Sequence, residues 1–378
     1  MSIIAAIAAE PSFEELVQQT LAITVLLLPG LVVLWWTRAY RPSTIAGPIR
    51  VPDEAELWPI PVAVVIAFIA WVGSAIVYSI SMGMTEMASG AATQPASGEA
   101  DIAMSIGPVD FAVLAAVTPL IGLFAAVGFL MLVKPAALHW IGMAGARLPR
   151  GLMFAAVAAV FAVPATMFVG GLTELAYKSV GYQHPAEHEL LKFMKEAPAA
   201  WIKWAAIVAA VAVAPLFEEF LFRGLIQTSL VTWFTRWGRQ ARPIFAGYPP
   251  AEVASGYPLQ PVADIPPSLP PAYQPVPPDA TAMPGPQLPY ALPVSYASPV
   301  IGYESPPASK RIRAAWLGVI ITSVLFAVIH PLWTAPIIFF LSLALGYLYE
   351  RTGNLWACIL LHAMFNAVST TIYLLFGA

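Results

Sequence analysis

The residues of this chain that could do chemistry fall into three short runs with helical spacing. The runs are Pro215-Leu-Phe-Glu-Glu-Phe-Leu-Phe-Arg-Gly224, Phe326-Ala-Val-Ile-His330 and His362-Ala-Met-Phe-Asn366. Together they offer two carboxylates, a guanidinium, two imidazoles and an amide. These groups are sufficient to activate a water and hold an oxyanion. They are also sufficient for a metal site with two histidines and one carboxylate, so the residue types leave both chemistries open.

Helix geometry gives the two glutamates of the first run different roles. Glu219 and Arg223 are four residues apart, so their side chains lie on one face and should form a buried ion pair. Glu218 is turned about 100° away from Glu219 and has no partner on its own helix. An unpaired carboxylate in this setting suits proton transfer, and we expect its partner to be a histidine on another helix.

The other two runs use the same spacing and also allow purely structural explanations. His362 and Asn366 project together, as a catalytic pair or as a hydrogen-bonding contact between helices. His330 shares a face with Phe326, although it could equally be an interfacial histidine at a helix end before Pro331. The first run could likewise be a structural ion-pair network. The three runs in one chain favour chemistry over these separate explanations.

The composition places these runs in a membrane. Of the 378 residues, 59% are hydrophobic and only 10% are charged, whereas a soluble domain carries about 25% charged residues. So few charges cannot cover a water-facing surface, which excludes a soluble enzyme, and there is no basic face for nucleic acid. One cysteine excludes a disulfide framework and a cysteine-rich zinc site. The remaining class is an all-α, polytopic integral membrane protein.

Eight stretches are long and apolar enough to cross a bilayer, which takes about 20 residues each. They are residues 19–37, 60–82, 111–133, 152–175, 199–233, 314–333, 335–351 and 354–377. The fifth is too long for a simple span, so it must tilt, bend at Pro215 or project from the membrane. The three runs lie in the fifth, sixth and eighth stretches, which confines the intramembrane chemistry to the C-terminal half.

Positive charges predict the orientation of the spans. Basic residues gather in the connections after the first, third, fifth and seventh spans, whereas residues 83–110 contain no Lys or Arg. This alternation predicts that both termini lie outside. Glu218 and His330 each lie about 25 Å along their helices from the basic connection between the fifth and sixth spans. The two side chains can therefore meet at one depth, in the half of the membrane nearer the outer side.

Residues 241–310 differ in kind from the rest of the chain. They hold 19 of the 37 prolines, and proline at that density removes backbone donors and opposes helix and central strand. We expect a disordered or polyproline-II linker between two spans. A docking site for proline-recognising partners is the functional alternative.

The three runs, in this order, resemble the CPBP family of intramembrane proteases. This family includes the type II CAAX prenyl endopeptidases and the lysostaphin-resistance-protein-A-like (Abi) proteins. The surrounding sequence agrees, with Pro215 before the glutamates, Gly224 after the arginine and Arg351-Thr-Gly-Asn354 before the last run. The resemblance covers residues 200–235 and 312–378.

The resemblance implies three parts. Residues 1–198 would be a variable N-terminal membrane region of four helices. Residues 199–235 and 312–378 would form a four-helix CPBP-like catalytic membrane core. Residues 236–311 depart from the short connection usual in the family and would be a Pro-rich disordered insertion, which leaves the core intact if it loops out.

The resemblance also implies catalytic roles. The residues that match the family pattern are Glu218, Glu219, Arg223, His330, His362 and Asn366. Glu218 would polarise the attacking water with His330 as its partner, and the Glu219–Arg223 pair would support the site. The last run would stabilise the oxyanion or position water. Both a metalloprotease and a metal-independent glutamate mechanism have been argued for the family, so a divalent metal such as zinc stays open as a cofactor.

The expected function is an intramembrane endopeptidase that hydrolyses a peptide bond in a membrane-tethered or lipidated peptide. Its partners would be that substrate and the lipid bilayer, with no nucleic acid, and we expect a multi-pass protein of a bacterial cytoplasmic membrane. The alternative is a non-catalytic scaffold or a proton-coupled transporter that uses the same Glu and His residues. Transporters usually show repeats in both halves, whereas the polar residues here are confined to one half.

Two further patterns look chemical but are interpreted structurally. His184 and His188 have metal-ligand spacing, yet residues 186–196 have the pattern of an amphipathic interfacial helix. Cys358 shares a face with the third run, and we interpret it as a small core residue.

Overall fold

The computed structural model describes residues 12–39, 41–45, 57–88, 108–182, 199–237, 242–244, 300–302 and 307–376. Its helices are α2 (Phe13–Thr37), α3 (Pro59–Ala88), α4 (Pro108–Val133), α5 (Ala136–Trp140), α6 (Leu148–Ser179), α8 (Ala200–Val208), α9 (Ala214–Glu219), α10 (Thr228–Arg236), α11 (Ala308–Val328), α12 (Ala335–Thr352) and α13 (Leu355–Phe376). Short 3-10 turns are η1 (Pro42–Ile45), η3 (Gly145–Arg147) and η6 (Leu332–Thr334), and π-helical segments are η4 (Ala209–Val213) and η5 (Phe220–Gln227). Eight helical segments in this part of the chain are long and apolar enough to span a membrane. The predicted all-α, multi-pass architecture is therefore confirmed.

Several spans extend beyond their expected ends because their polar ends stay helical. Helix α2 begins at Phe13 rather than at residue 19. Ser12 and Glu15 form a reciprocal capping box at this earlier start. Helix α11 begins at Ala308 rather than residue 314, so its first turns carry the basic residues of the connection. Hydropathy reports only the apolar middle of such helices and leaves out charged turns that project into water.

The fifth span changes helical register on both sides of α9, near the Pro215 at which the sequence allowed a bend. Proline has no N–H, and its ring crowds the carbonyl of the preceding turn. The π-helical segment η4 lies directly before Pro215 in the sequence, and η5 follows α9. Between them α9 carries Glu218 and Glu219. The site is thus built on a short α-helical turn between two widened turns, a feature often found at functional sites.

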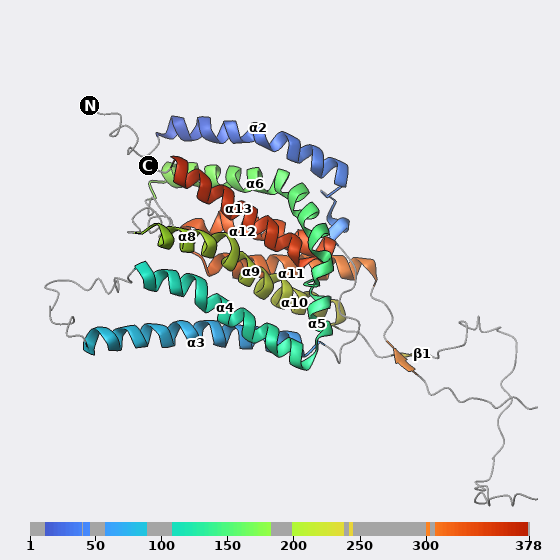
Figure 1. Cartoon of the computed structure of the whole chain (residues 1–378). Helices are drawn as coiled ribbons and strands as arrows, with labels where there is room; N and C mark the ends of the chain where they lie inside the picture. The colour runs from blue at the N-terminus through green and yellow to red at the C-terminus, as the bar shows by residue number, and fades with distance from the viewer. Residues whose placement is uncertain are drawn as a thin grey trace, which may run out of the picture. The chain divides into compact units, whose positions relative to one another are not determined.

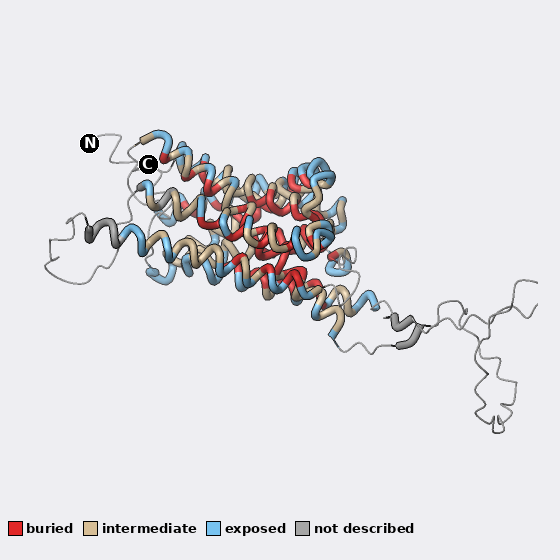
Figure 2. Tube along the Cα trace, turned by 60° about the horizontal axis from the view of Figure 1, so that its bottom comes forward, coloured by how far each residue is buried: buried red, intermediate tan, exposed pale blue. Residues whose placement is uncertain are grey.

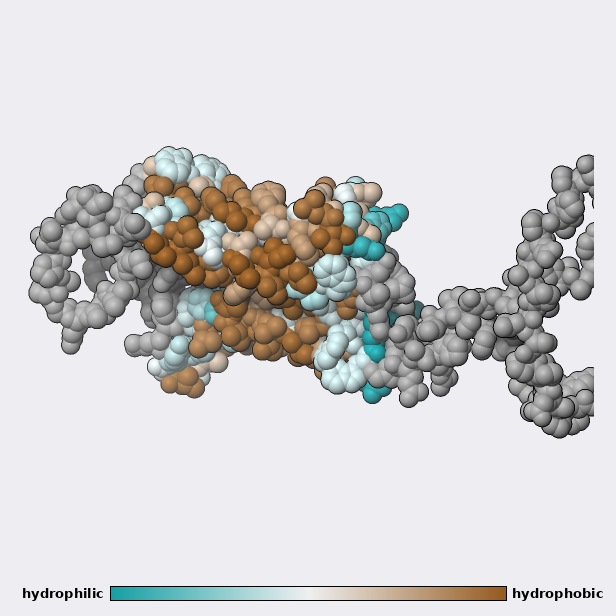
Figure 3. Space-filling model, turned by 90° about the horizontal axis from the view of Figure 1, so that it is seen from below, coloured by the Kyte–Doolittle hydropathy of each residue, from teal (hydrophilic) through white to brown (hydrophobic). Residues whose placement is uncertain are grey.

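The membrane unit, residues 1–237 and 306–378, is layered around its C-terminal helices. Helix α2 packs on α6 at one side and α3 packs on α4 at the other, with α8–α10 and α11–α13 between them (Figure 1). Buried residues concentrate in this middle layer (Figure 2). A belt of apolar side chains covers the outside between paler, more polar ends (Figure 3). The belt suits contact with lipid, and the polar runs lie in the protected interior.

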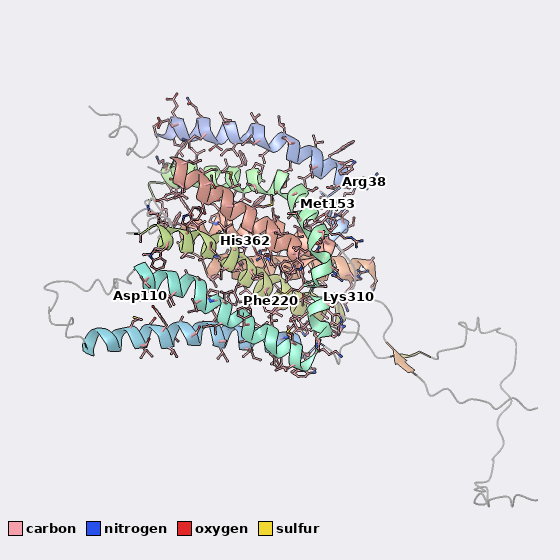
Figure 4. All side chains as sticks on the ribbon, viewed as in Figure 1. Arg38, Asp110, Met153, Phe220, Lys310 and His362 are labelled. Atoms are coloured by element: carbon pink, nitrogen blue, oxygen red, sulfur yellow. The ribbon has the colours of Figure 1, made fainter. Side chains whose placement is uncertain are left out.

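Basic residues gather at one end of the unit, as the charge pattern predicted. Arg38 and Lys310 lie at that end, and Asp110 lies at the opposite end (Figure 4). Arg351 Nη2 donates to the carbonyl of Thr37 at 3.1 Å. The charge separation along the sequence is thus a separation along the axis of the bundle.

The Arg351-Thr-Gly-Asn354 context of the family pattern has a structural role at this end. Gly353 caps α12 in the left-handed conformation, with φ of 60°. Arg147 Nη1 donates to the carbonyl of Gly353 at 2.7 Å, and Asn354 Nδ2 donates to the carbonyl of Arg147 at 3.0 Å. These bonds tie the connection between α5 and α6 to the start of α13, which carries His362.

The unit Gly238–Ser305 contains most of the Pro-rich segment. Its described residues form two short antiparallel strands, β1 (Arg242–Ile244) and β2 (Val300–Gly302), with Arg242 opposite Gly302. The many prolines of this segment predicted that it would not form strands. In a two-stranded sheet, however, each strand has an outer edge without a partner, and there Pro243 needs no backbone N–H. The rest of this segment, and the His184 and His188 pattern, lie outside the described residues.

Candidate active site

Four of the six predicted site residues come into mutual contact midway along the bundle. Glu218 and Glu219 lie on α9, and Arg223 lies on η5. His362 lies on α13 (Figure 4). Glu219, Arg223 and His362 are buried, whereas the Glu218 side chain is 22% exposed. The sequence places α9 and α13 more than a hundred residues apart, so this contact is made by packing.

The contacts form a chain of polar groups. Arg223 Nη1 donates to Glu219 Oε1 at 2.7 Å, which confirms the predicted ion pair. His362 Nδ1 reaches the same oxygen at 2.9 Å. His362 Nε2 lies 3.9 Å from Glu218 Oε2. The histidine therefore stands between the two glutamates, with one nitrogen toward each.

This placement determines where the protons of His362 lie. The ionised Glu219 oxygen can only accept, so Nδ1 carries a proton and donates it. Nε2 faces Glu218 Oε2 at 3.9 Å. This distance is longer than a direct hydrogen bond, so the two groups face each other without one. A carboxylate that orients a histidine in this way is a recurring catalytic arrangement.

The exposure of Glu218 separates it from its neighbour. Glu219 is 0% exposed and has a cation and an imidazole as partners. Glu218 is within electrostatic reach of His362, His330, Glu219 and Arg223, and part of its side chain is accessible. Of the two glutamates, Glu218 is therefore the accessible one and Glu219 is fully enclosed. The geometry agrees with the sequence-based division between a proton-transfer glutamate and a supporting one.

His330 approaches the site through an aromatic ring. Its Nδ1 donates to the carbonyl of Phe326 at 2.7 Å, since a carbonyl can only accept. Its ring centroid lies 4.8 Å from that of Phe326, which lies 5.9 Å from the ring of His362. The guanidinium of Arg223 also lies over Phe326, at 4.5 Å from the centroid. His330 thus keeps Nε2 for water or substrate, and the contact at Glu218 is made by His362 rather than by His330.

Asn366 makes a bond that the sequence did not predict. Its Nδ2 donates to the carbonyl of Ala210 at 2.8 Å. In the π register of η4, Ala214 N–H bonds to the carbonyl of Ala209, so the next acceptor, Ala210, would need the N–H of Pro215. Proline has none. The amide of Asn366 therefore satisfies a carbonyl that the register change leaves without a helical donor.

We expect Asn366→Leu to lower the free energy of unfolding by about 1–3 kcal/mol, because it strands the buried carbonyl of Ala210. The measurement is thermal or denaturant unfolding in detergent. The double variant Asn366→Leu/Pro215→Ala supplies a backbone N–H and should recover part of the loss. Equal stability of Asn366→Leu and the parent would contradict this role.

The donor set does not fit a tightly held metal. Among the described residues, no group of three or more His, Cys, Asp or Glu side chains is placed to hold an ion. The carboxylate and the two imidazoles of the predicted metal set are therefore not arranged as one ligand cluster.

The sequence did not predict the contact of Ser342 with Arg223 or the contact of Phe326 with His362. Ser342 lies on α12, and its Oγ accepts from Arg223 Nη2 at 2.6 Å. A serine in an apolar span gives no signal by itself. Phe326 was placed beside His330, but its contact with His362 depends on packing. Cys358, by contrast, is buried as expected of a core residue, with Sγ 3.4 Å from the carbonyl of Leu345.

Comparison with known proteins agrees with the family suggested by the three runs. Residues 199–247 and 305–368 match a family model described as Type II CAAX prenyl endopeptidase Rce1-like. No curated protein and no solved structure matches the chain significantly. The two matched segments contain all six predicted site residues. Over these two segments, therefore, the chain is similar to the Rce1-like type II CAAX prenyl endopeptidase family.

Proposed function

We propose that this protein is an intramembrane endopeptidase that hydrolyses a peptide bond in a membrane-tethered or lipidated peptide. The observation that carries the proposal is the placement of His362 between a buried, ion-paired Glu219 and an accessible Glu218. A carboxylate that water can reach, beside a histidine with a fixed proton, is what water activation requires. The family match supports this class of bond and of substrate.

In the proposed reaction, Glu218 accepts a proton from a water whose oxygen attacks the carbonyl carbon of the substrate. The negative charge that develops on the carbonyl oxygen is stabilised by a hydrogen bond from an N–H of His330 or His362, which keeps its proton. The C–N bond then breaks, and the proton held at Glu218 passes to the leaving nitrogen. Each turnover consumes one water and restores Glu218 to its starting state.

The supporting groups keep His362 in one orientation through the cycle. Glu219 accepts from Nδ1, which directs Nε2 toward Glu218. Arg223 neutralises Glu219, so the imidazole meets a paired carboxylate rather than an isolated charge. Preorganised donors of this kind need little rearrangement when charge develops.

A divalent metal is not used in any step of this proposal, because the described donors do not form a ligand cluster. We therefore expect activity to survive overnight dialysis of the purified protein against 1,10-phenanthroline and metal-free buffer. The measurement is the initial rate before and after treatment, with metal content determined in parallel. Loss of activity that added zinc restores would show that a metal takes part.

The proposal is tested with purified protein in lipid vesicles. The probe is a farnesylated peptide ending in Cys-aliphatic-aliphatic-X, and the matched control is the same peptide without the lipid. We expect release of the C-terminal tripeptide, detected by mass, from the lipidated peptide only. Cleavage of both peptides would place recognition in the peptide rather than in the lipid, and cleavage of neither would remove prenylated peptides from the substrate class.

A further inference from the structure

The contact between Arg223 and α12 belongs to no step proposed above. Arg223 Nη2 donates to Ser342 Oγ at 2.6 Å and approaches the Ser342 carbonyl at 3.3 Å. Ser342 is 1% exposed, and Arg223 is 0% exposed. The guanidinium is thus held at one edge by Glu219 on its own span and at the other by a different helix.

The same two helices make a second contact in the same register. Gln227 Nε2 donates to the carbonyl of Gly346 at 3.1 Å, one turn beyond the Arg223–Ser342 pair. In each pair, the two residues are 119 positions apart in the sequence. Because residue numbers rise together along the two contacts, α12 and the fifth span run parallel. A shift of α12 by one residue along the fifth span would therefore break both contacts.

Gly346 is part of this fit. A Cβ added there would lie 2.9 Å from Gln227 Oε1 and 3.0 Å from Val319 Cγ1. The glycine therefore lets α12 approach closely enough for the polar side chains of the fifth span to reach it. The Ser342 contact belongs to a closely packed interface rather than to a single flexible side chain.

We propose that Ser342 is a positioning residue for the reaction, acting through Arg223 and Glu219 on His362. The inference rests on the proposed function and extends it to α12. Four contacts carry the effect, namely Ser342–Arg223 at 2.6 Å, Arg223–Glu219 at 2.7 Å, Glu219–His362 at 2.9 Å and His362–Glu218 at 3.9 Å. Ser342 touches neither water nor substrate in this scheme. It determines where the guanidinium sits, and hence which oxygen of Glu219 the imidazole meets.

The test compares Ser342→Ala with Ser342→Thr, which keeps the hydroxyl. Ser323→Ala is the matched control, because Ser323 is equally buried on the adjacent α11 and its Oγ has no hydrogen-bond partner among the described residues. With the farnesylated peptide, we expect Ser342→Ala to lower kcat about tenfold with KM unchanged, the size expected when a hydrogen bond to a charged group is lost. We expect Ser342→Thr to restore most of kcat and Ser323→Ala to keep it. Equal kcat for Ser342→Ala and Ser323→Ala would overturn the proposal.

A spectroscopic readout separates this inference from the proposed function. The protein has five histidines, so ¹⁵N-histidine labelling and a His362→Gln reference identify the His362 signals by solid-state NMR. We expect Ser342→Ala to shift the Nδ1 signal of His362 and Ser323→Ala to leave it in place, whether or not the peptide is cleaved. A shift without peptidase activity would support Ser342 and contradict the proposed reaction. An unmoved Nδ1 signal in Ser342→Ala would overturn the inference even in an active protease.

Discussion

Glu218→Gln should reduce peptide hydrolysis by about 10²–10⁴-fold, the range that general base catalysis contributes. Glutamine has nearly the same shape as glutamate but cannot accept the proton of the attacking water. It also removes the carboxylate charge that faces His362 Nε2 at 3.9 Å. The measurement is kcat/KM with the farnesylated peptide in vesicles.

The stability of Glu218→Gln is its control. The Glu218 side chain is 22% exposed and is not part of the Arg223–Glu219 ion pair. We therefore expect the Tm in detergent to stay within about 2 °C of the parent, as for a substitution away from a buried network. Glu14→Gln, at the polar start of α2, should change neither property. Full activity of Glu218→Gln would show that another group takes the proton.

Arg223→Ala should cost about 3–5 kcal/mol of folding free energy as well as activity, because it leaves a buried carboxylate without its cation. Glu219 would keep only the His362 contact, and the Ser342 acceptors would lose their donor. The cation–π contact with Phe326 at 4.5 Å would be lost too. Yield after membrane extraction and thermal unfolding measure the folding effect, and the peptide assay measures the catalytic one.

A double variant separates the two effects of Arg223. Glu219→Gln/Arg223→Met removes both charges together, and replacing a buried ion pair by neutral groups is often tolerated. We expect it to recover most of the stability lost in Arg223→Ala. It should remain inactive, because His362 then lacks the carboxylate that orients it. An Arg223→Ala protein with normal yield and Tm would contradict the structural role.

The sequence predicted the local part of the site and missed the part that packing creates. The Glu219–Arg223 pair could be predicted because residues four apart share a helix face. The sequence could indicate that Glu218 needs a histidine from another helix. The family resemblance favoured His330, whereas packing brings His362 to that place. Which imidazole meets which carboxylate depends on helix rotation, and periodicity does not fix rotation.

Hydropathy predicted the number of spans but not the detailed geometry of the fifth one. Eight apolar stretches predicted eight spans, and Pro215 predicted a bend in the fifth. The observed change, two π-helical segments around α9, was not predictable because a proline can also be accommodated by a kink. The role of Asn366 depends on this change, since its acceptor, the carbonyl of Ala210, is unpaired only in the π register.

The central claim, that this protein hydrolyses membrane-tethered peptides with Glu218 as its base, is tested most directly by quantitative proteomics of membrane peptides. Cells producing the parent protein are compared with cells producing Glu218→Gln at the same level. The account predicts at least one membrane-associated peptide with a new terminus in the parent cells and its uncut precursor in the variant cells. Identical peptide termini in the two cell lines, with both proteins folded in the membrane, would contradict it.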